Sequence, residues 1–149
     1  MLVSAMARKM HAFIALSIAI SSTALPGAMA QSSAAIASAL RGMDSPDVEI
    51  RVDSYLALTR VASTEGGVGA LYLPDQIEYL LHRYPDQAGQ IRTSLIAALE
   101  REEMHLEGLR QRKQTFDESY SEHYATLIWA VSSLRDPRAV MALLGAMQI

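Results

Sequence analysis

Three histidines lie beyond residue 30, and each has a glutamate close to it in the sequence. The pairs are Glu78 with His82, Glu102 with His105, and Glu122 with His123. A helix brings residues three or four positions apart onto one face, so the first two pairs could each offer a nitrogen and an oxygen to a metal ion. Di-iron helical bundles use Glu-x-x-His, but they need two copies of it and two further glutamates on facing helices. Only Glu102 and His105 have that spacing.

We therefore expect His82 and His105 to lie on solvated helix faces, where an acidic neighbour contributes only tenths of a kcal/mol. A metal site that uses Glu78, His82, Glu102 and His105 is the alternative. No other pattern in the sequence indicates a cofactor, and we expect no cofactor.

The sequence contains no recognisable catalytic constellation. Nothing resembles the Gly-x-Ser-x-Gly turn that presents a nucleophilic serine. Residues 63–69, STEGGVG, are rich in glycine, but no Gly-Lys-Ser/Thr follows them, so a phosphate-binding loop is not indicated. Carboxylates are abundant, yet abundance selects no acid/base pair. We expect no catalytic residue and no enzymatic activity.

Residues 1–30 have the three parts of a cleavable secretory signal peptide, in the required order. Two basic residues precede an apolar stretch over residues 12–25, which is shorter than the roughly 20 apolar residues that span a bilayer. Pro26 then disfavours a continuing helix. Ala28 and Ala30 supply small side chains three positions and one position before the cut, which predicts cleavage between Ala30 and Gln31.

Cleavage changes the composition on which the chain is classified. Removing 30 of the 149 residues leaves 119, the length of one compact domain. The two basic residues of the signal peptide go, so 11 basic residues face 16 acidic ones and the net charge is about −5. A nucleic-acid partner needs a basic face and is not expected. No stable membrane anchor is expected after cleavage.

The chain has no cysteine. An exported protein without cysteine has no disulfide, no cysteine-ligated zinc and no lipid attached at a cysteine. Such a domain must be held together by apolar packing, which 119 residues can supply. We expect a bacterial protein that works in the periplasm or is secreted.

Three regions follow from these patterns: the signal peptide (1–30), an Ala/Ser-rich linker or weak helix (31–46), and a helical domain (47–149). Apolar periodicity, prolines and glycines place the helices of the domain. They are expected over residues 47–62, 74–83, 85 to at least 103, 118–134 and 137–147. Residues 63–69 are expected to stop the first of these helices, since three glycines in four positions disfavour regular structure.

The apolar spacing also predicts which side of each helix is buried. For the first helix of the domain the expected buried residues are Val48, Val52, Tyr55, Leu56 and Thr59. For the helix that begins at residue 85 they are Ile91, Leu95, Ala98 and Leu99. For the helix that begins at residue 118 they are Tyr120, Tyr124, Leu127, Ile128 and Val131, and we expect Trp129 in the core as well.

One pattern occurs twice. Residues 74–81 and 137–144 both read P-x-x-[IV]-x-x-L-L, 63 residues apart. The second copy follows Asp136, which is expected to cap a helix that has Pro137 in its first position. Residues 130–147, with Leu-x-Asp-Pro-Arg-Ala-Val, resemble a bacterial HEAT-type repeat. The residues that carry the resemblance are Asp136, Pro137, Arg138, Val140, Leu143 and Leu144.

The resemblance implies antiparallel helix pairs stacked as a short α-solenoid, which binds a partner along its surface and carries no catalytic residues. We therefore expect an all-α, HEAT-like scaffold or adaptor that binds another protein, of unknown identity, in the cell envelope. Two alternatives stay open. One is a small metal- or ligand-binding protein that uses the Glu/His pairs, and the other is a non-catalytic N-terminal part of a larger enzyme.

The last expected helix is apolar on most of its surface. Val140, Leu143, Leu144 and Met147 share the side expected to be buried, and little of the far side is polar. A terminal repeat ordinarily needs a polar outer face to stay soluble. We expect this helix to be covered by a partner or a second copy of the chain, or to continue into a longer repeat array.

Overall fold

The structure, a computed structural model, describes residues 26–66, 73–115 and 118–148. Every regular element in these ranges is a helix, which confirms the expected all-α class. The helices are α2 (Pro26–Gly42), α3 (Val48–Gly66), α4 (Leu73–Arg83), α5 (Pro85–Gln111), α6 (Glu118–Ser133) and α7 (Ala139–Ala146). None of the helices in these ranges is long and apolar enough to cross a membrane.

The predicted signal peptide is only partly within the described residues. Its basic start and its apolar stretch lie outside them. Ala28, Ala30 and Gln31, the residues at the predicted cleavage point, lie in the first turns of α2 and are exposed. Residues Gln31–Ile149 pack together as one compact unit.

The Ala/Ser-rich segment that follows is helical rather than a linker. Ile36, Leu40 and Met43 recur at helical spacing and are almost fully buried in the core. These three large apolar side chains on one side of a helix of small residues explain the packing. Of the two alternatives that the sequence left open for residues 31–46, the structure shows the helix up to Gly42.

The buried side of α3 differs from the expected one. Its buried residues are Arg51, Tyr55, Leu58 and Ala62. Leu56, which we expected in the core, is 41% exposed. The prediction was wrong because it did not count Arg51 among the buried residues, since arginine is ordinarily exposed. Arg51 is buried here because it has a buried acidic partner on another helix.

Helix α3 is also longer than predicted. It continues through Ser63 and ends at Gly66. The hydroxyl of Ser63 donates to the carbonyl oxygen of Thr59 at 3.1 Å, so its polar group is satisfied within the helix. Residues 67–69, the rest of the segment expected to stop this helix, lie outside the described residues.

Helices α4 and α5 agree with their predicted bounds. Tyr84 alone separates them, and Pro85 opens α5, where its missing N–H has no intrahelical partner to lose. All the residues expected on the stripe of α5 are buried, namely Ile91, Leu95, Ala98 and Leu99. The charged segment after residue 100 continues the helix through Gly108 to Gln111.

Two expectations for the C-terminal helices were wrong. Trp129 is 64% exposed, because the buried face of α6 is made by other residues and Trp129 lies away from it. In α7 the small side chains of Ala139 and Ala142 are the buried ones, and Leu143 is partly buried against the core. Val140, Leu144 and Met147, expected on the buried side, are 51%, 48% and 84% exposed.

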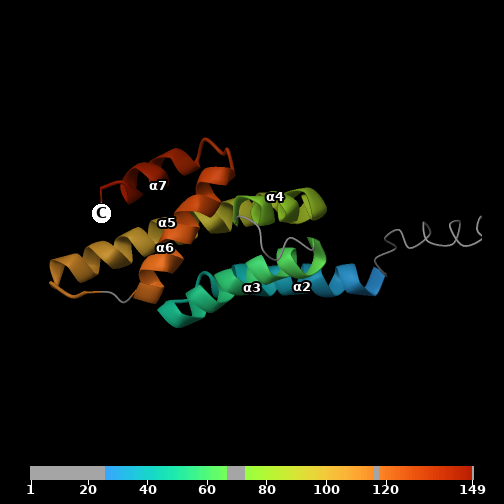
Figure 1. The fold of residues 1–149 in the computed structure, drawn as a ribbon, viewed down its shortest axis with the longest axis horizontal. Coiled ribbons are helices and arrows are strands. Elements are labelled where there is room, and N and C mark those ends of the chain that lie inside the picture. Colours follow the sequence, from blue (N-terminus) through green and yellow to red (C-terminus); the bar gives the residue numbers. More distant parts are fainter. Residues whose placement is uncertain (1–25, 67–72, 116–117, 149) are drawn as a thin grey trace, which may run out of the picture. The chain divides into compact units, whose positions relative to one another are not determined.

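The helices of this unit pack mainly on their neighbours in the chain. Helix α4 contacts α3, α5 and α6, while α5 contacts α6 and α7, and α6 contacts α7 (Figure 1). Helix α2 is joined to α5 by a hydrogen bond of 3.1 Å from the Gln87 side chain to the Ser33 carbonyl oxygen. The 27-residue helix α5 is thus the element against which most of the others are placed.

Candidate functional site

A buried ion pair joins α3 to α5. The Arg51 guanidinium donates from Nε to Glu102 Oε1 at 2.5 Å and from Nη2 to Glu102 Oε2 at 2.9 Å. The two side chains are 4% and 1% exposed. This two-pronged geometry matches the planar fork of arginine to the carboxylate and fixes the direction of both side chains.

The remaining donor group of Arg51 also has partners. Nη1 donates to the carbonyl oxygens of Ser45 and Pro46, at 3.1 and 3.0 Å. These carbonyls belong to the turn between α2 and α3. Arg51 therefore holds that turn as well as α5, and its charge is satisfied on every side that the structure describes.

Two residues of α6 complete a buried polar cluster, which we define as Arg51, Glu102, Tyr120 and His123. The Tyr120 hydroxyl donates to Glu102 Oε2. The imidazole of His123 lies edge-on to the Tyr55 ring, with centroids 5.4 Å apart, and 6.1 Å from the Tyr120 ring. Helices α3, α5 and α6 thus meet at this cluster.

The surroundings shift the pKa values of the cluster in opposite directions. Burial opposes ionisation of Glu102, but hydrogen bonds from Arg51 and Tyr120 outweigh it and hold the pKa of this carboxyl below its ordinary value. Its hydrogen bond to Glu102 raises the pKa of Arg51. Burial, followed by the hydrogen bond to Glu102, raises the pKa of Tyr120. The ion pair is consequently charged throughout the physiological range.

The surroundings of His123 favour its neutral form. Burial lowers the pKa of His123; Glu102 opposes that shift, and the Arg51 charge adds to it. Its Nδ1 atom is buried and has no hydrogen-bond partner among the described residues. A neutral imidazole therefore lies beside the ion pair, packed between Tyr55 and Tyr120.

The buried polar cluster has little room for chemistry. A general acid or base must reach the proton that it transfers. Glu102 is 1% exposed and its two oxygens accept three hydrogen bonds, from Arg51 and Tyr120. The arrangement ties three helices together and offers a substrate no access to its charges.

The Glu/His pairs that could have held a metal are not assembled into one site. Glu102 is committed to Arg51, while the ring of His105 packs against Tyr120 at 5.5 Å. His82 is exposed, and its Nδ1 lies 2.9 Å from the backbone carbonyl oxygen of Glu78. Within the described ranges, no group of three or more His, Cys, Asp or Glu side chains could hold a metal ion.

The repeat-like segment forms a turn as well as a helix. Asp136 accepts a hydrogen bond of 2.9 Å from the backbone N–H of Arg138 and pairs with its guanidinium at 2.6 Å. This pairing lowers the pKa of Asp136 to about 2. Arg135, just before it, has a φ of 50°, which reverses the chain between α6 and α7. The expectation that Asp136 caps the last helix, with Pro137 in its first position, was wrong. Helix α7 begins at Ala139, and Asp136 instead accepts the Arg138 backbone N–H within the turn that precedes the helix.

The two copies of P-x-x-[IV]-x-x-L-L differ in burial. In α4, Ile77 and Leu80 are fully buried. In the second copy Val140 is exposed, and Leu143 is only partly buried. The match in sequence therefore does not extend to equivalent packing.

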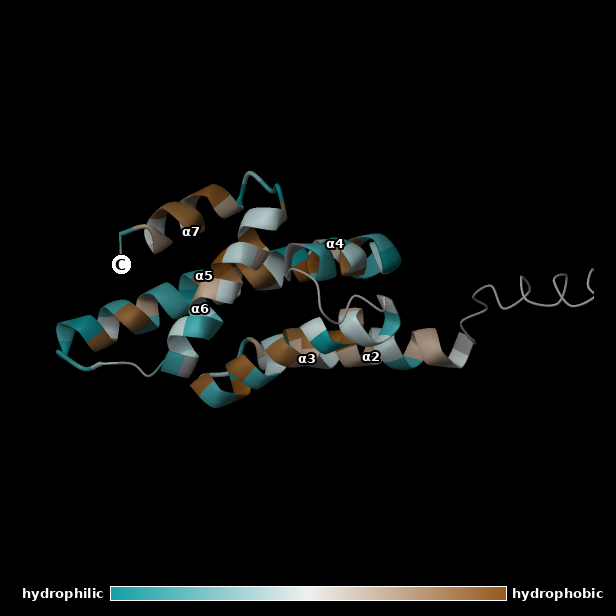
Figure 2. Cartoon of the chain, in the orientation of Figure 1, coloured by the Kyte–Doolittle hydropathy of each residue, from teal (hydrophilic) through white to brown (hydrophobic). Residues whose placement is uncertain are grey.

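Helix α7 presents an uncovered apolar face, defined by Val140, Met141, Leu144 and Met147. These side chains are 51%, 73%, 48% and 84% exposed. Figure 2 shows α7 as hydrophobic over most of its length. Residues 139–149 contain no charged side chain. Contiguous apolar surface of this kind marks interaction sites on soluble proteins.

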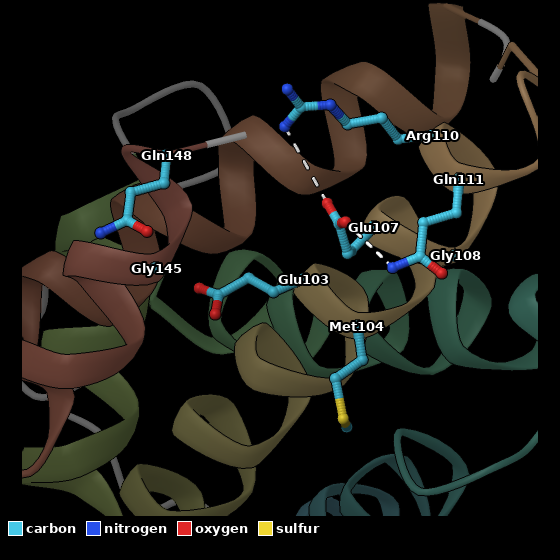
Figure 3. Close-up of a pocket in the computed structure, with 8 residues that line it drawn as sticks. All are labelled: Glu103, Met104, Glu107, Gly108, Arg110, Gln111, Gly145 and Gln148. Atoms are coloured by element: carbon cyan, nitrogen blue, oxygen red, sulfur yellow. Dashed lines mark hydrogen bonds and ion pairs between the residues drawn. The ribbon is translucent and has the colours of Figure 1, made fainter.

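A groove of about 520 Å³ lies between α5 and α7, beside this face (Figure 3). Met104 on its wall is 70% exposed. Glu103 is half-buried, and burial followed by the charge of Glu100 raises its pKa. Glu107 pairs with Arg110 at 3.9 Å and accepts a hydrogen bond from Gln111. The groove thus adds an exposed methionine and acidic groups to the surroundings of the apolar face.

No family model matches the chain, and neither a curated protein nor a solved structure matches it.

The linkage between His123 and folding predicts a pH dependence. Because its pKa is lower folded than unfolded, the unfolded chain binds more protons as pH falls below about 6.5, the ordinary histidine value. The stability that neutral His123 contributes is complete above that pH and is lost as pH falls through its folded pKa. We expect the free energy of unfolding, measured with urea at fixed pH values, to fall between pH 7 and 5, and less so in His123→Gln.

The matched control for that measurement is His82→Gln, since His82 is exposed on α4 and outside the cluster. It should keep the pH dependence of the parent chain. An identical pH profile in the parent and His123→Gln would show that His123 is not buried in its neutral form.

Proposed function

We propose that the chain is an exported, non-catalytic helical scaffold that binds another protein in the cell envelope. The uncovered apolar face of α7 carries this proposal. Four large apolar side chains lie on it, and two of them, Met141 and Met147, are more than 70% exposed. Methionine is flexible and polarisable, which suits a surface that must adapt to a partner.

The way the helices pack supports the scaffold part of the proposal. Each helix from α3 to α7 packs on helices that are one or two positions away in the chain. The exceptions are the contacts made through the buried cluster and those made by α2. A HEAT-like solenoid packs in the same sequential manner. The Arg51–Glu102 pair ties α3 to α5, and α7 packs on α5 and α6.

The export part of the proposal rests on residues 1–30 alone. If it is correct, a bacterial host that makes the full chain will export it and remove residues 1–30. Intact-mass analysis of the recovered protein should then find a chain that begins at Gln31. Ala28→Arg with Ala30→Arg should leave the chain uncut, because large charged side chains do not suit the positions before the cut.

A control for this test is Ala34→Arg with Ala35→Arg, which alters exposed alanines after the cut. These variants should be processed like the parent. Recovery of the uncut parent chain from the cytoplasm would contradict export.

The binding part is tested by placing a charge on the apolar face. Met141→Glu should lower the fluorescence of a dye that binds apolar surface and reduce crosslinking to envelope proteins at least tenfold. A buried charge at the centre of an interface costs several kcal/mol when it has no partner. Leu56→Glu is the matched control, because Leu56 is also exposed but lies on α3.

Light scattering distinguishes a second copy of the chain from another protein as the partner. Self-association through α7 would appear as a dimer that Met141→Glu dissociates, and it would replace the proposed heterologous partner. A parent chain that is monomeric, binds no dye and crosslinks to the same extent as Met141→Glu would contradict a binding role for this face.

A further inference from the structure

We infer that a second surface, the groove between α4 and α6 around Trp129, binds an extended peptide segment that carries both an acidic and a basic residue beside an apolar one. This Trp129 groove has a volume of about 680 Å³ and shares no lining residue with the groove beside α7. Pockets that bind ligands commonly lie between 300 and 1,000 Å³.

The exposed indole is the first observation behind this inference. Trp129 is 64% exposed, although tryptophan is highly buried on average. Its ring lines the groove together with Leu81 of α4. Tryptophan and arginine dominate the residues that carry binding energy in protein interfaces. An apolar or aromatic side chain of a peptide can pack on this ring.

The charges around the groove are separated by sign. On one side α4 contributes Asp75 and Glu78, one helical turn apart and both exposed. On the other side lie Arg92 of α5 and Arg135 of the turn after α6. Among the described residues, no salt bridge joins the acidic side to the basic side. Opposite charges that line one groove without pairing suit a ligand that carries both signs.

One of the two arginines is held in position by the backbone. Arg92 donates from Nη1 to the carbonyl oxygen of Leu134 at 3.3 Å, which fixes its guanidinium at the end of α6. Arg135 has a φ of 50°, in the left-handed region that residues other than glycine seldom adopt. Arg92 and Arg135 both line the groove, and a guanidinium can donate two hydrogen bonds to a carboxylate.

A peptide satisfies this arrangement better than a single ion does. A lone cation would meet the arginines, and a lone anion would meet the carboxylates. A segment with one residue of each sign pairs with both sides, while the apolar residue between them covers the indole. The inference rests on the proposed binding function and adds a second surface that is independent of α7. The α7 face and the Trp129 groove can therefore be tested, and excluded, separately.

Trp129 is the only tryptophan of the chain, so its fluorescence reports directly on this groove. The probes are the capped hexapeptides GKLFEG and its reverse GEFLKG, with GQLFQG as the neutral control. We expect at least one charged peptide to shift the emission to the blue and to protect Trp129 from acrylamide, with saturation. It should bind at least tenfold more tightly than GQLFQG.

Two variants test the charge assignment with the same peptides. Arg135→Ala and Glu78→Gln should each weaken binding of the charged peptide five- to tenfold, and 0.5 M salt should weaken it too, because these charges are exposed. Arg60→Ala and Glu118→Gln are matched controls with exposed charges outside the groove, and they should bind like the parent. Circular dichroism checks that every variant is folded.

The inference is overturned if the neutral peptide binds as tightly as the charged ones, or if free phenylalanine produces the same shift. It is also overturned if none of the peptides changes the fluorescence at millimolar concentration. If no peptide binds but a partner is still captured through Met141, only the Trp129 groove is excluded as a binding surface and the proposed scaffold function stands. If peptides bind but no partner is captured through α7, only the α7 face is excluded.

Discussion

The buried pair between Arg51 and Glu102 is the constraint on which the rest of this helical unit depends. Two charges removed from water cost several kcal/mol each unless their hydrogen bonds are complete. Here they are complete, because Arg51 donates to Glu102 and to two backbone carbonyls, and Tyr120 donates to the same carboxylate. The pair therefore sets the relative positions of α3, α5 and α6. It selects one arrangement of these helices in addition to stabilising the fold.

Helix existence could be predicted from the sequence, whereas the buried polar cluster could not. The periodic stripe of α5 and the prolines at its start act locally, so Ile91 and Leu95 were assigned correctly. Arg51 and Glu102 are 51 positions apart, and no local pattern connects them. Once Arg51 is buried, the face of α3 turns and Leu56 becomes exposed. The signal that could have been used is that Arg51, Tyr55, Leu58 and Ala62 also share one helical face.

The buried polar cluster offers no surface for recognition. Its central ion pair is almost fully buried, and the hydrogen bonds of Arg51 and Glu102 are complete, as a structural tie requires. Trp129 and three residues of the α7 face, Val140, Leu144 and Met147, were expected in the core and are exposed. The interactions that stabilise the fold thus lie inside the unit, and the exposed apolar residues are not needed to stabilise it.

A double-mutant cycle on Arg51 and Glu102 tests the central claim, that the buried cluster is a structural tie. Urea unfolding should show that Arg51→Met and Glu102→Met each cost about 3–5 kcal/mol, since each leaves one buried charge unpaired. The double variant should cost no more than either, while Arg110→Met, which breaks the exposed pair with Glu107, should cost under about 1 kcal/mol. Losses below about 1 kcal/mol for both single variants, or strictly additive losses, would contradict the account.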